Sequence, residues 1–162
     1  MNLDFGEKVL FLYTENMCGI VGILGVKTTK KEALSRKMTE VIHHRGPDQD
    51  GFFSDENVGL GMRRLSIIDI SSGKQPIENA DGSLLIIFNG EIYNYKELRA
   101  ELLAEGRIFK THSDTEVILQ MYEAHGPKSV SRLRGMFAFA IYNKRTGKVF
   151  ICLLYTSPSP RD

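Results

Sequence analysis

The sequence has 162 residues, of which 42% are hydrophobic and 25% charged, a composition typical of one folded globular domain. Lysine and arginine number 21 against 20 aspartate and glutamate, so the chain lacks the basic excess of a nucleic-acid or anionic-membrane binder. Two cysteines, Cys18 and Cys152, are too few for a disulfide framework. We therefore expect a cytoplasmic protein with a small-molecule ligand, no nucleic acid and no membrane among its partners.

The first sixteen residues lack the features of an export signal. They have no basic start followed by a cleavable small-residue pattern, and the apolar run Val9 to Tyr13 is too short to span a bilayer. Met17 stands directly before Cys18, as a start codon would. We predict that residues 1–16 are a mis-called start, with a cleaved propeptide as the alternative.

A buried strand and a helix are predicted next. Residues 19–24 are apolar, β-branched and punctuated by glycine, which favours a strand where backbones approach closely. Thr29 and Glu32 form a capping box before a helix that ends at 44–47, His-Arg-Gly-Pro. The apolar residues of this helix recur at helical spacing: Leu34, Met38, Val41 and Ile42.

The middle of the chain is rich in predicted strands. Short strands are expected around Phe52, over 58–65 and over 84–88. Asp81-Gly82 supplies the hairpin turn before the last of these.

Two helices follow. The first is capped by Asn94 and Glu97 and ends at Gly106, and the second is capped by Ser113 and Glu116. The second helix has its apolar residues on one side: Val117, Ile118, Met121 and Tyr122. A strand-rich middle followed by two helices is typical of an α+β fold.

The chain closes with a predicted hairpin and a run of different character. Residues 136–142 and 148–151 alternate as strands around a turn at 144–147. Residues 152–162 abandon this pattern for a Ser/Pro run that resembles one reading frame of a sequencing adapter. We predict that they are an artefact, with a natural flexible tail as the alternative, so that residues 17–151 are the domain.

Cys18 is the sharpest chemical signal. A free cysteine is usually a small buried hydrophobe. If Met17 is removed, however, Cys18 carries a free α-amine beside its own thiol. An α-amine has a pKa of about 7.7–8.0, so it can accept the thiol proton and return it to a leaving group. Cys18 is therefore a candidate nucleophile with a built-in base.

Asn89 and Gly90 are candidates for an oxyanion hole. They follow the predicted strand over 84–88, where a side-chain amide and a glycine N–H can point at one spot. An Asn-Gly pair in this position is also typical of a simple turn. The surrounding motifs distinguish the two interpretations.

Six motifs resemble, in order, the class II glutamine amidotransferase domain of asparagine synthetases. They are Met17-Cys18-Gly19-Ile20-Val21-Gly22, His44-Arg45-Gly46-Pro47-Asp48, Arg64-Leu65-Ser66-Ile67-Ile68-Asp69, Asn89-Gly90-Glu91-Ile92-Tyr93-Asn94, Ser113-Asp114-Thr115-Glu116-Val117 and Gly135-Met136-Phe137-Ala138-Phe139-Ala140. One such motif is a weak signal, whereas six in order are specific. The resemblance implies an N-terminal-nucleophile hydrolase fold, a four-layer α/β/β/α sandwich, incomplete at its C-terminus.

The resemblance also implies roles for individual residues. Cys18 would form a glutamyl thioester, with Asn89 and Gly90 stabilising the oxyanion. Arg64 would bind the α-carboxylate of glutamine, and Glu91 and Asp114 its α-amino group. The glutamine-binding residues would be Arg64, Leu65, Ser66, Ile67, Ile68, Asn89, Gly90, Glu91 and Asp114. Without the resemblance, Arg64 could form a surface ion pair and Asp114 could serve as a helix-capping residue.

No metal site is predicted. The adjacent His43 and His44 would point about 100° apart on a helix, and no cluster of further ligands joins them. Residues 44–48 are instead expected to shape a loop over the glutamine pocket. ATP and Mg²⁺ are implied only for a synthetase domain that would follow this segment and amidate aspartate, and the resemblance also allows a homodimer.

Two alternatives remain at this stage. Sugar-phosphate and phosphoribosyl amidotransferases share the Cys-Gly-Ile start but differ in the middle motifs, and some asparagine synthetase relatives amidate other carboxylates in cell-surface or polysaccharide pathways. The second alternative is a non-catalytic domain that binds glutamine. It gains weight if residues 1–16 are retained, because the Cys18 nitrogen would then be an amide and not a base.

Overall fold

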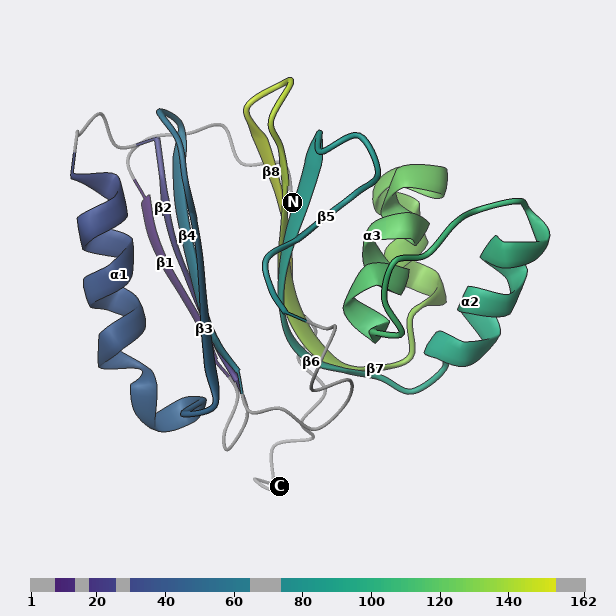
Figure 1. Ribbon diagram of the computed structural model, residues 1–162, viewed down its shortest axis with the longest axis horizontal. Helices are drawn as coiled ribbons and strands as arrows, with labels where there is room; N and C mark the ends of the chain where they lie inside the picture. Colours follow the sequence, from purple (N-terminus) through teal and green to yellow (C-terminus); the bar gives the residue numbers. More distant parts are fainter. Residues whose placement is uncertain (1–7, 14–17, 26–29, 65–73, 154–162) are drawn as a thin grey trace, which may run out of the picture.

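A computed structural model describes residues 8–13, 18–25, 30–64 and 74–153, with only the backbone described for 8–13. Within these ranges the chain forms two four-stranded sheets that face each other, with helices on both outer sides (Figure 1). The layers follow the order helix, sheet, sheet, helix. This arrangement confirms the predicted α/β/β/α sandwich.

The elements have the following bounds. The strands are β1 (Lys8–Tyr13), β2 (Gly19–Leu24), β3 (Gln49–Ser54), β4 (Val58–Arg64), β5 (Ile77–Glu78), β6 (Leu84–Ile92), β7 (Gly135–Asn143) and β8 (Lys148–Leu153). The α-helices are α1 (Lys31–Val41), α2 (Tyr95–Ala104) and α3 (Asp114–His125), and the 3-10 helices are η1 (His43–Arg45) and η2 (Gly126–Arg132).

The two sheets are held together by an apolar core between them. The first sheet has the order β1-β2-β4-β3 and the second the order β5-β6-β7-β8, with all pairings antiparallel. The core residues are Ile20, Leu24, Val58, Leu60 and Met62 from the first sheet and Leu85, Ile87, Ala138, Ala140, Tyr142 and Val149 from the second. Burial of such surface is the main stabilising contribution to folding, about 25 cal/mol per Å².

Helix α1 packs on the outer face of the first sheet through small polar residues. Ser35 and Thr39 are buried, and their hydroxyls donate to the carbonyls of Lys31 and Ser35 at 2.8 Å each. A Cβ on Gly59 or Gly61 of β4 would lie 2.3 Å from Ser35 Oγ or 2.2 Å from Thr39 Oγ1. The helix therefore approaches the sheet more closely than larger side chains would allow.

The predicted inner face of α1 is wrong. Leu34 and Val41 are 41% and 71% exposed, and Met38 is half-buried, so of the expected apolar series only Ile42 is buried. The close approach to the glycines of β4 selects Ser35 and Thr39 for the interface instead. The capping residue Thr29 lies outside the described residues.

Helix α3 lies on the outer face of the second sheet. It is at the centre of a second apolar core, which is separate from the core between the sheets. All its residues from Asp114 to Met121 are buried, so the expected one-sided apolar face is replaced by burial on all sides. Ser113 Oγ accepts the Thr115 N–H at 3.1 Å, which confirms Ser113 as the cap. The predicted partner Glu116 instead accepts the N–H groups of Lys110 and Thr111 at 2.8 and 2.7 Å.

Three further expectations need correction. Asn94 precedes α2 as predicted, but its side chain bonds Arg132 O and Arg134 N, at 3.0 Å each, and does not cap the helix. Strand β8 continues two residues beyond its predicted end, through Leu153, opposite Ala138. Strand β1, which was not predicted, pairs with β2 along its whole length. Residues 154–162 lie outside the described residues.

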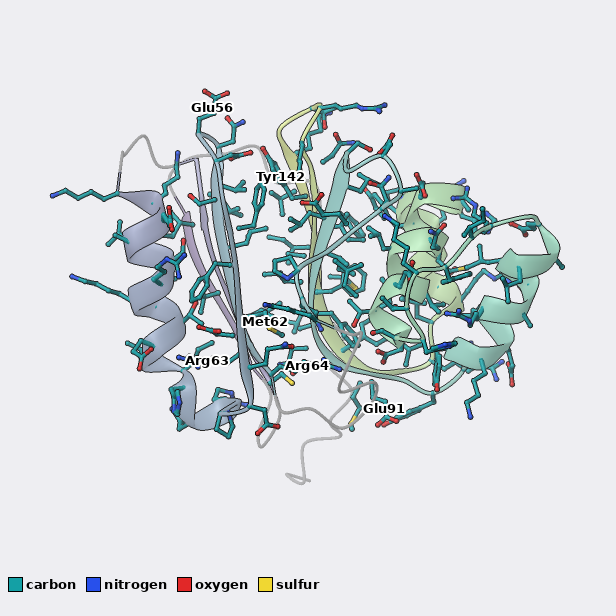
Figure 2. The ribbon with its side chains drawn as sticks, viewed as in Figure 1. Glu56, Met62, Arg63, Arg64, Glu91 and Tyr142 are labelled. Atoms are coloured by element: carbon teal, nitrogen blue, oxygen red, sulfur yellow. The ribbon has the colours of Figure 1, made fainter. Side chains whose placement is uncertain are left out.

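A buried tyrosine joins the sheets at one end of the core. Tyr142 of β7 is 0% exposed, and its hydroxyl donates to Asp55 Oδ2 at 2.6 Å and accepts from Asn57 Nδ2 at 3.3 Å. Asp55 Oδ1 also accepts the N–H groups of Asn57 and Val58, at 2.8 Å each. The β3–β4 turn is therefore fastened to the second sheet by a single phenol (Figure 2).

The Tyr142 hydroxyl is expected to contribute measurably to stability. Tyr142→Phe should lower the free energy of unfolding by about 1–2 kcal/mol, because it removes a hydrogen bond to a carboxylate. Urea unfolding followed by circular dichroism would measure the change. Tyr93→Phe is the matched control, because Tyr93 is 58% exposed. Equal effects of the two substitutions would contradict this role.

The same hydroxyl predicts a loss of stability at alkaline pH. Burial, and then the hydrogen bond to Asp55, raise the pKa of Tyr142 to about 12. The unfolded value is about 10, so the contribution is complete below pH 10 and lost as the pH rises through the folded value. The difference in stability between the parent and Tyr142→Phe should therefore shrink over this interval. A difference that stays constant would contradict the assignment.

Candidate active site at the end of the sheet sandwich

Strand alternation brings polar side chains from both sheets to one end of the core. In β4 the core residues Leu60 and Met62 are followed, in the same alternation, by Arg64. In β6 the core residue Ile87 is followed by Asn89 and then Glu91 on the same face. Figure 2 shows Arg64 and Glu91 at the same end of the sandwich, opposite Tyr142. This end is the candidate site.

Cys18 joins the site from the first sheet. It precedes β2 and is half-buried, two residues before the core residue Ile20. Gly19 pairs with Arg63, so continuing this register by one residue places Cys18 across from Arg64. Cys18 and Arg64 therefore lie at the same end of the neighbouring strands β2 and β4.

A carboxylate pair faces Arg64 from the second sheet and α3. Asp114 Oδ2 accepts the Ile92 N–H at 3.1 Å, which fastens the start of α3 to the end of β6. Burial, with a contribution from the negative charge of Glu91, raises the pKa of Asp114, while hydrogen bonds to Ile92 and Thr115 and the charge of Arg64 oppose the rise. The structure thus brings Arg64, Glu91 and Asp114 within electrostatic range of one another.

Asn89 is a buried amide without hydrogen bonds in the described part of the chain. Its side chain is 0% exposed, and both Nδ2 and Oδ1 have no partner there. A buried polar group left in this state costs about 1–3 kcal/mol, so it is uncommon unless a ligand completes it. The amide nitrogen is available as a donor in the space between the sheets.

Gly90 follows Asn89 inside β6, because the strand continues to Ile92 and not only to the predicted end at 88. The simple turn, which was the alternative interpretation of this pair, is therefore wrong. The φ of Gly90 is +143°, and a Cβ would lie 2.1 Å from the Met136 carbonyl oxygen of β7. The backbone therefore admits only glycine at this point. The Asn-Gly pair is part of a distorted strand next to the candidate site.

The loop after α1 also reaches the site. Pro47 forms an isolated bridge with Arg64, and Gln49 of β3 pairs with the same residue. Pro47 therefore lies beside Arg64, and the loop over a glutamine pocket expected for residues 44–48 stays a prediction. Gln49 was not predicted as a neighbour of the site, because only the register of β3 against β4 places it beside Arg64. Leu65, Ser66, Ile67 and Ile68 lie outside the described residues.

The arrangement combines groups suited to a small zwitterion. It places a thiol, a guanidinium, two carboxyl groups and a buried amide at one end of the sandwich, and such groups can bind a carboxylate and an ammonium group. The described residues contain no cluster of three or more His, Cys, Asp or Glu side chains that could hold a metal ion. In the same described ranges, no helix has both the length and the apolar character needed to cross a bilayer.

Comparisons with known proteins identify relatives of this chain. Residues 17–153 match the family described as "Glutamine amidotransferase domain". The chain is 54% identical over 132 residues to glutamine-hydrolyzing asparagine synthetase 1 of Bacillus subtilis, covering 79% of this chain and 21% of the relative. It is 42% identical over 131 residues to glutamine-hydrolyzing asparagine synthetase B of Escherichia coli, covering 78% and 23%. The chain thus spans about a fifth of the length of these curated relatives.

A solved structure has the same architecture. Glutamine phosphoribosylpyrophosphate amidotransferase from Bacillus subtilis matches with a TM-score of 0.62 at 23% identity, covering 77% of this chain and 35% of that chain. At this identity the likeness concerns the fold. It supports the four-layer sandwich architecture expected from the sequence.

The Asn89 amide has no hydrogen-bond partner among the described residues, so its replacement by an apolar side chain should not destabilise the fold. Asn89→Leu should leave the free energy of unfolding unchanged or raise it by about 1–2 kcal/mol, because it removes an uncompensated polar group. Asn79 is the matched control. It is also buried, but its side chain bonds Ser83, Leu84 and Glu123.

Asn79→Leu should therefore lower the free energy of unfolding by about 2–3 kcal/mol, since it removes the partner of the Leu84 N–H and of Glu123 Oε1. Chemical denaturation of the two variants in parallel measures the contrast. A loss of stability in Asn89→Leu as large as that in Asn79→Leu would show that the Asn89 amide is satisfied.

Proposed function

This chain belongs to the glutamine amidotransferase domain family, and from that membership we propose that it is the glutamine-hydrolysing half of an asparagine synthetase-like enzyme. The observation that best supports this role is the buried amide of Asn89, which has no hydrogen-bond partner among the described residues. It lies on β6, in the sheet that faces β2, and β2 begins directly after Cys18. In the proposed complete enzyme, a following synthetase domain uses ATP and Mg²⁺ to activate aspartate. The ammonia released from glutamine serves as its nitrogen source.

Cys18 is the proposed nucleophile. Its thiol sulfur attacks the side-chain carboxamide carbon of glutamine, and the Cys18 α-amine accepts the thiol proton. The tetrahedral intermediate then expels ammonia, which takes that proton, and a γ-glutamyl thioester remains. Water attacks the thioester, glutamate leaves, and the thiol is restored. Each step balances without any further reactant.

Asn89 and Gly90 are proposed to stabilise the oxyanion. The Asn89 Nδ2–H groups have no acceptor in the described residues, so they are not diverted from a substrate oxygen. The dry surroundings between the sheets strengthen such a bond, because the local dielectric constant is low. No reorganisation of the side chain is needed, because the amide is already buried and packed.

Arg64, Glu91 and Asp114 are proposed to bind the amino-acid end of glutamine. A guanidinium fork matches a carboxylate geometrically, and the two carboxyl groups can receive the ammonium group. Asp114 Oδ2 also accepts the Ile92 N–H, which holds this carboxyl group at the end of β6. Leu65, Ser66, Ile67 and Ile68 are proposed as further contacts on the basis of the resemblance.

The state of the Cys18 nitrogen is expected to control activity. While Met17 remains bonded to Cys18, the Cys18 nitrogen is an amide and not a basic amine, so we expect this form to be inactive. A full-length polypeptide that begins at Cys18 should release glutamate from glutamine, and Cys18→Ala should abolish the release. Ion chromatography or a coupled dehydrogenase assay measures glutamate. Undiminished glutamate release by Cys18→Ala would rule out the nucleophile.

Kinetics should separate the oxyanion donor from the binding residue. Asn89→Ala should lower kcat by about 10²–10³ with little change in KM, because the oxyanion forms only after attack. Arg64→Ala should raise KM by about 10–100-fold, the loss expected for one charge-assisted hydrogen bond. Steady-state glutaminase assays of both variants test this. The opposite pattern, with KM raised only by Asn89→Ala, would reverse the roles.

A further inference from the structure

Gln75 is a buried residue whose side chain extends the ladder between β5 and β6. Strand β5 pairs Ile77 with Ile86, and continuing this register by two residues places Gln75 opposite Phe88. Gln75 is 4% exposed, and its side-chain Oε1 accepts the Phe88 N–H at 2.7 Å. This bond holds β6 at the residue directly before Asn89.

The backbone carbonyl of Gln75 points to the other sheet. A Cβ on Gly51 of β3 would lie 1.9 Å from the Gln75 carbonyl oxygen, so this oxygen lies against β3. The side-chain oxygen takes the place of a backbone acceptor beside Phe88. Gln75 thus contacts β3 in one sheet and β6 in the other.

The nitrogen of the same side-chain amide binds the first turn of α3. Gln75 Nε2 donates to the Thr115 hydroxyl oxygen at 3.3 Å, and Thr115 is buried. The preceding residue, Asp114, accepts the Ile92 N–H at 3.1 Å. Two connections therefore join the start of α3 to β6, one at Phe88 through Gln75 and one at Ile92.

These two connections bracket residues 89–91, which carry the proposed oxyanion donors. The Asn89 side chain has no hydrogen-bond partner among the described residues, so its direction depends on the backbone and on packing. A bond to the Phe88 N–H fixes the plane of the peptide before Phe88. Only the φ and ψ of Phe88 then separate that plane from the peptide that leads into Asn89.

We propose that Gln75 is a positioning residue of the glutaminase site, which holds the Asn89 amide in place by joining β6 to the first turn of α3. The catalytic consequence rests on the proposed function, whereas the holding of β6 is a property of the fold. A shift of about 1 Å in a catalytic group can lower a rate by about 10²-fold. A side chain that prevents such a shift therefore contributes to kcat.

Gln75→Met tests the inference, because methionine has a similar length but lacks the amide donor and acceptor. The parent is a full-length polypeptide that begins at Cys18 and in which the remaining sequence of the Bacillus subtilis relative follows this domain. Gln75→Met should lower kcat for glutamate release by about 10–100-fold and change KM by less than about threefold. KM changes little because the bond between Asp114 and Ile92 is retained.

Asn79→Leu is the matched control for general destabilisation. Asn79 also extends the β5–β6 ladder through its side chain, because its Oδ1 accepts the Leu84 N–H at 2.9 Å. Leu84 lies at the other end of β6, five residues before Asn89. Asn79→Leu should therefore leave kcat within about twofold of the parent. An equal loss of kcat in Asn79→Leu and Gln75→Met would overturn the positioning role.

A double-mutant cycle measures whether Gln75 acts through Asn89. In an Asn89→Ala background, Gln75→Met should lower kcat by at most about threefold, because the amide that Gln75 holds is absent. The same loss in both backgrounds would overturn the inference. Thr115→Val removes one of the two bonds and should lower kcat by about 3–10-fold. Should Gln75→Met fail to fold, an unchanged kcat in Thr115→Val would overturn the inference instead.

Hydrogen exchange of the Phe88 amide, measured by mass spectrometry without glutamine, separates this inference from the proposed function. Gln75→Met should raise the exchange rate at Phe88 by about tenfold or more, whereas Asn79→Leu should raise it at Leu84. An unchanged rate at Phe88 would overturn the inference even in an active enzyme. A parent that releases no glutamate would instead refute the proposed function, and exchange at Phe88 would still decide whether Gln75 holds β6.

Discussion

The candidate site depends on one contact, the dry apolar packing of two β-sheets face to face. Side chains alternate along each strand, so the residues that follow Met62 in β4 and Ile87 in β6 must face the same space. At that end the alternation supplies Arg64 and Asn89 in place of further apolar residues. The core therefore fixes the distance and orientation of groups that are 25 residues apart in the sequence.

The same packing gives the Asn89 amide a capacity for a strong hydrogen bond that it would not have in water. A satisfied amide would be a structural element, as Asn79 is with its bonds to Ser83, Leu84 and Glu123. Asn89 instead retains unused donors in a low-dielectric space, at some expense in folding free energy. Sites that stabilise transition states are where such local losses are expected, because the missing bonds are completed only during the reaction.

Much of this fold could be predicted from the sequence, and the failures share a physical cause. Strong local signals, such as the apolar run of β2 and the Ser113 cap of α3, gave correct elements. The inner face of α1 could not be predicted, because the glycines of β4, distant in sequence, decide that Ser35 and Thr39 are buried. The same holds for the site: motifs suggested its members, but only strand register shows that Gln49 lies beside Arg64.

The central proposal is that Cys18, and not Cys152, lies at a glutamine-binding site. An electrophilic glutamine analogue, which reacts with a thiol at that site, tests it directly. Cys152 is an internal control, since it is also half-buried but packs against the other core, where burial raises the pKa of its thiol. Mass spectrometry of this chain begun at Cys18 and still carrying Cys152 should find one label, on Cys18, with protection by free glutamine. Equal labelling of Cys152, or no protection by glutamine, would contradict the account.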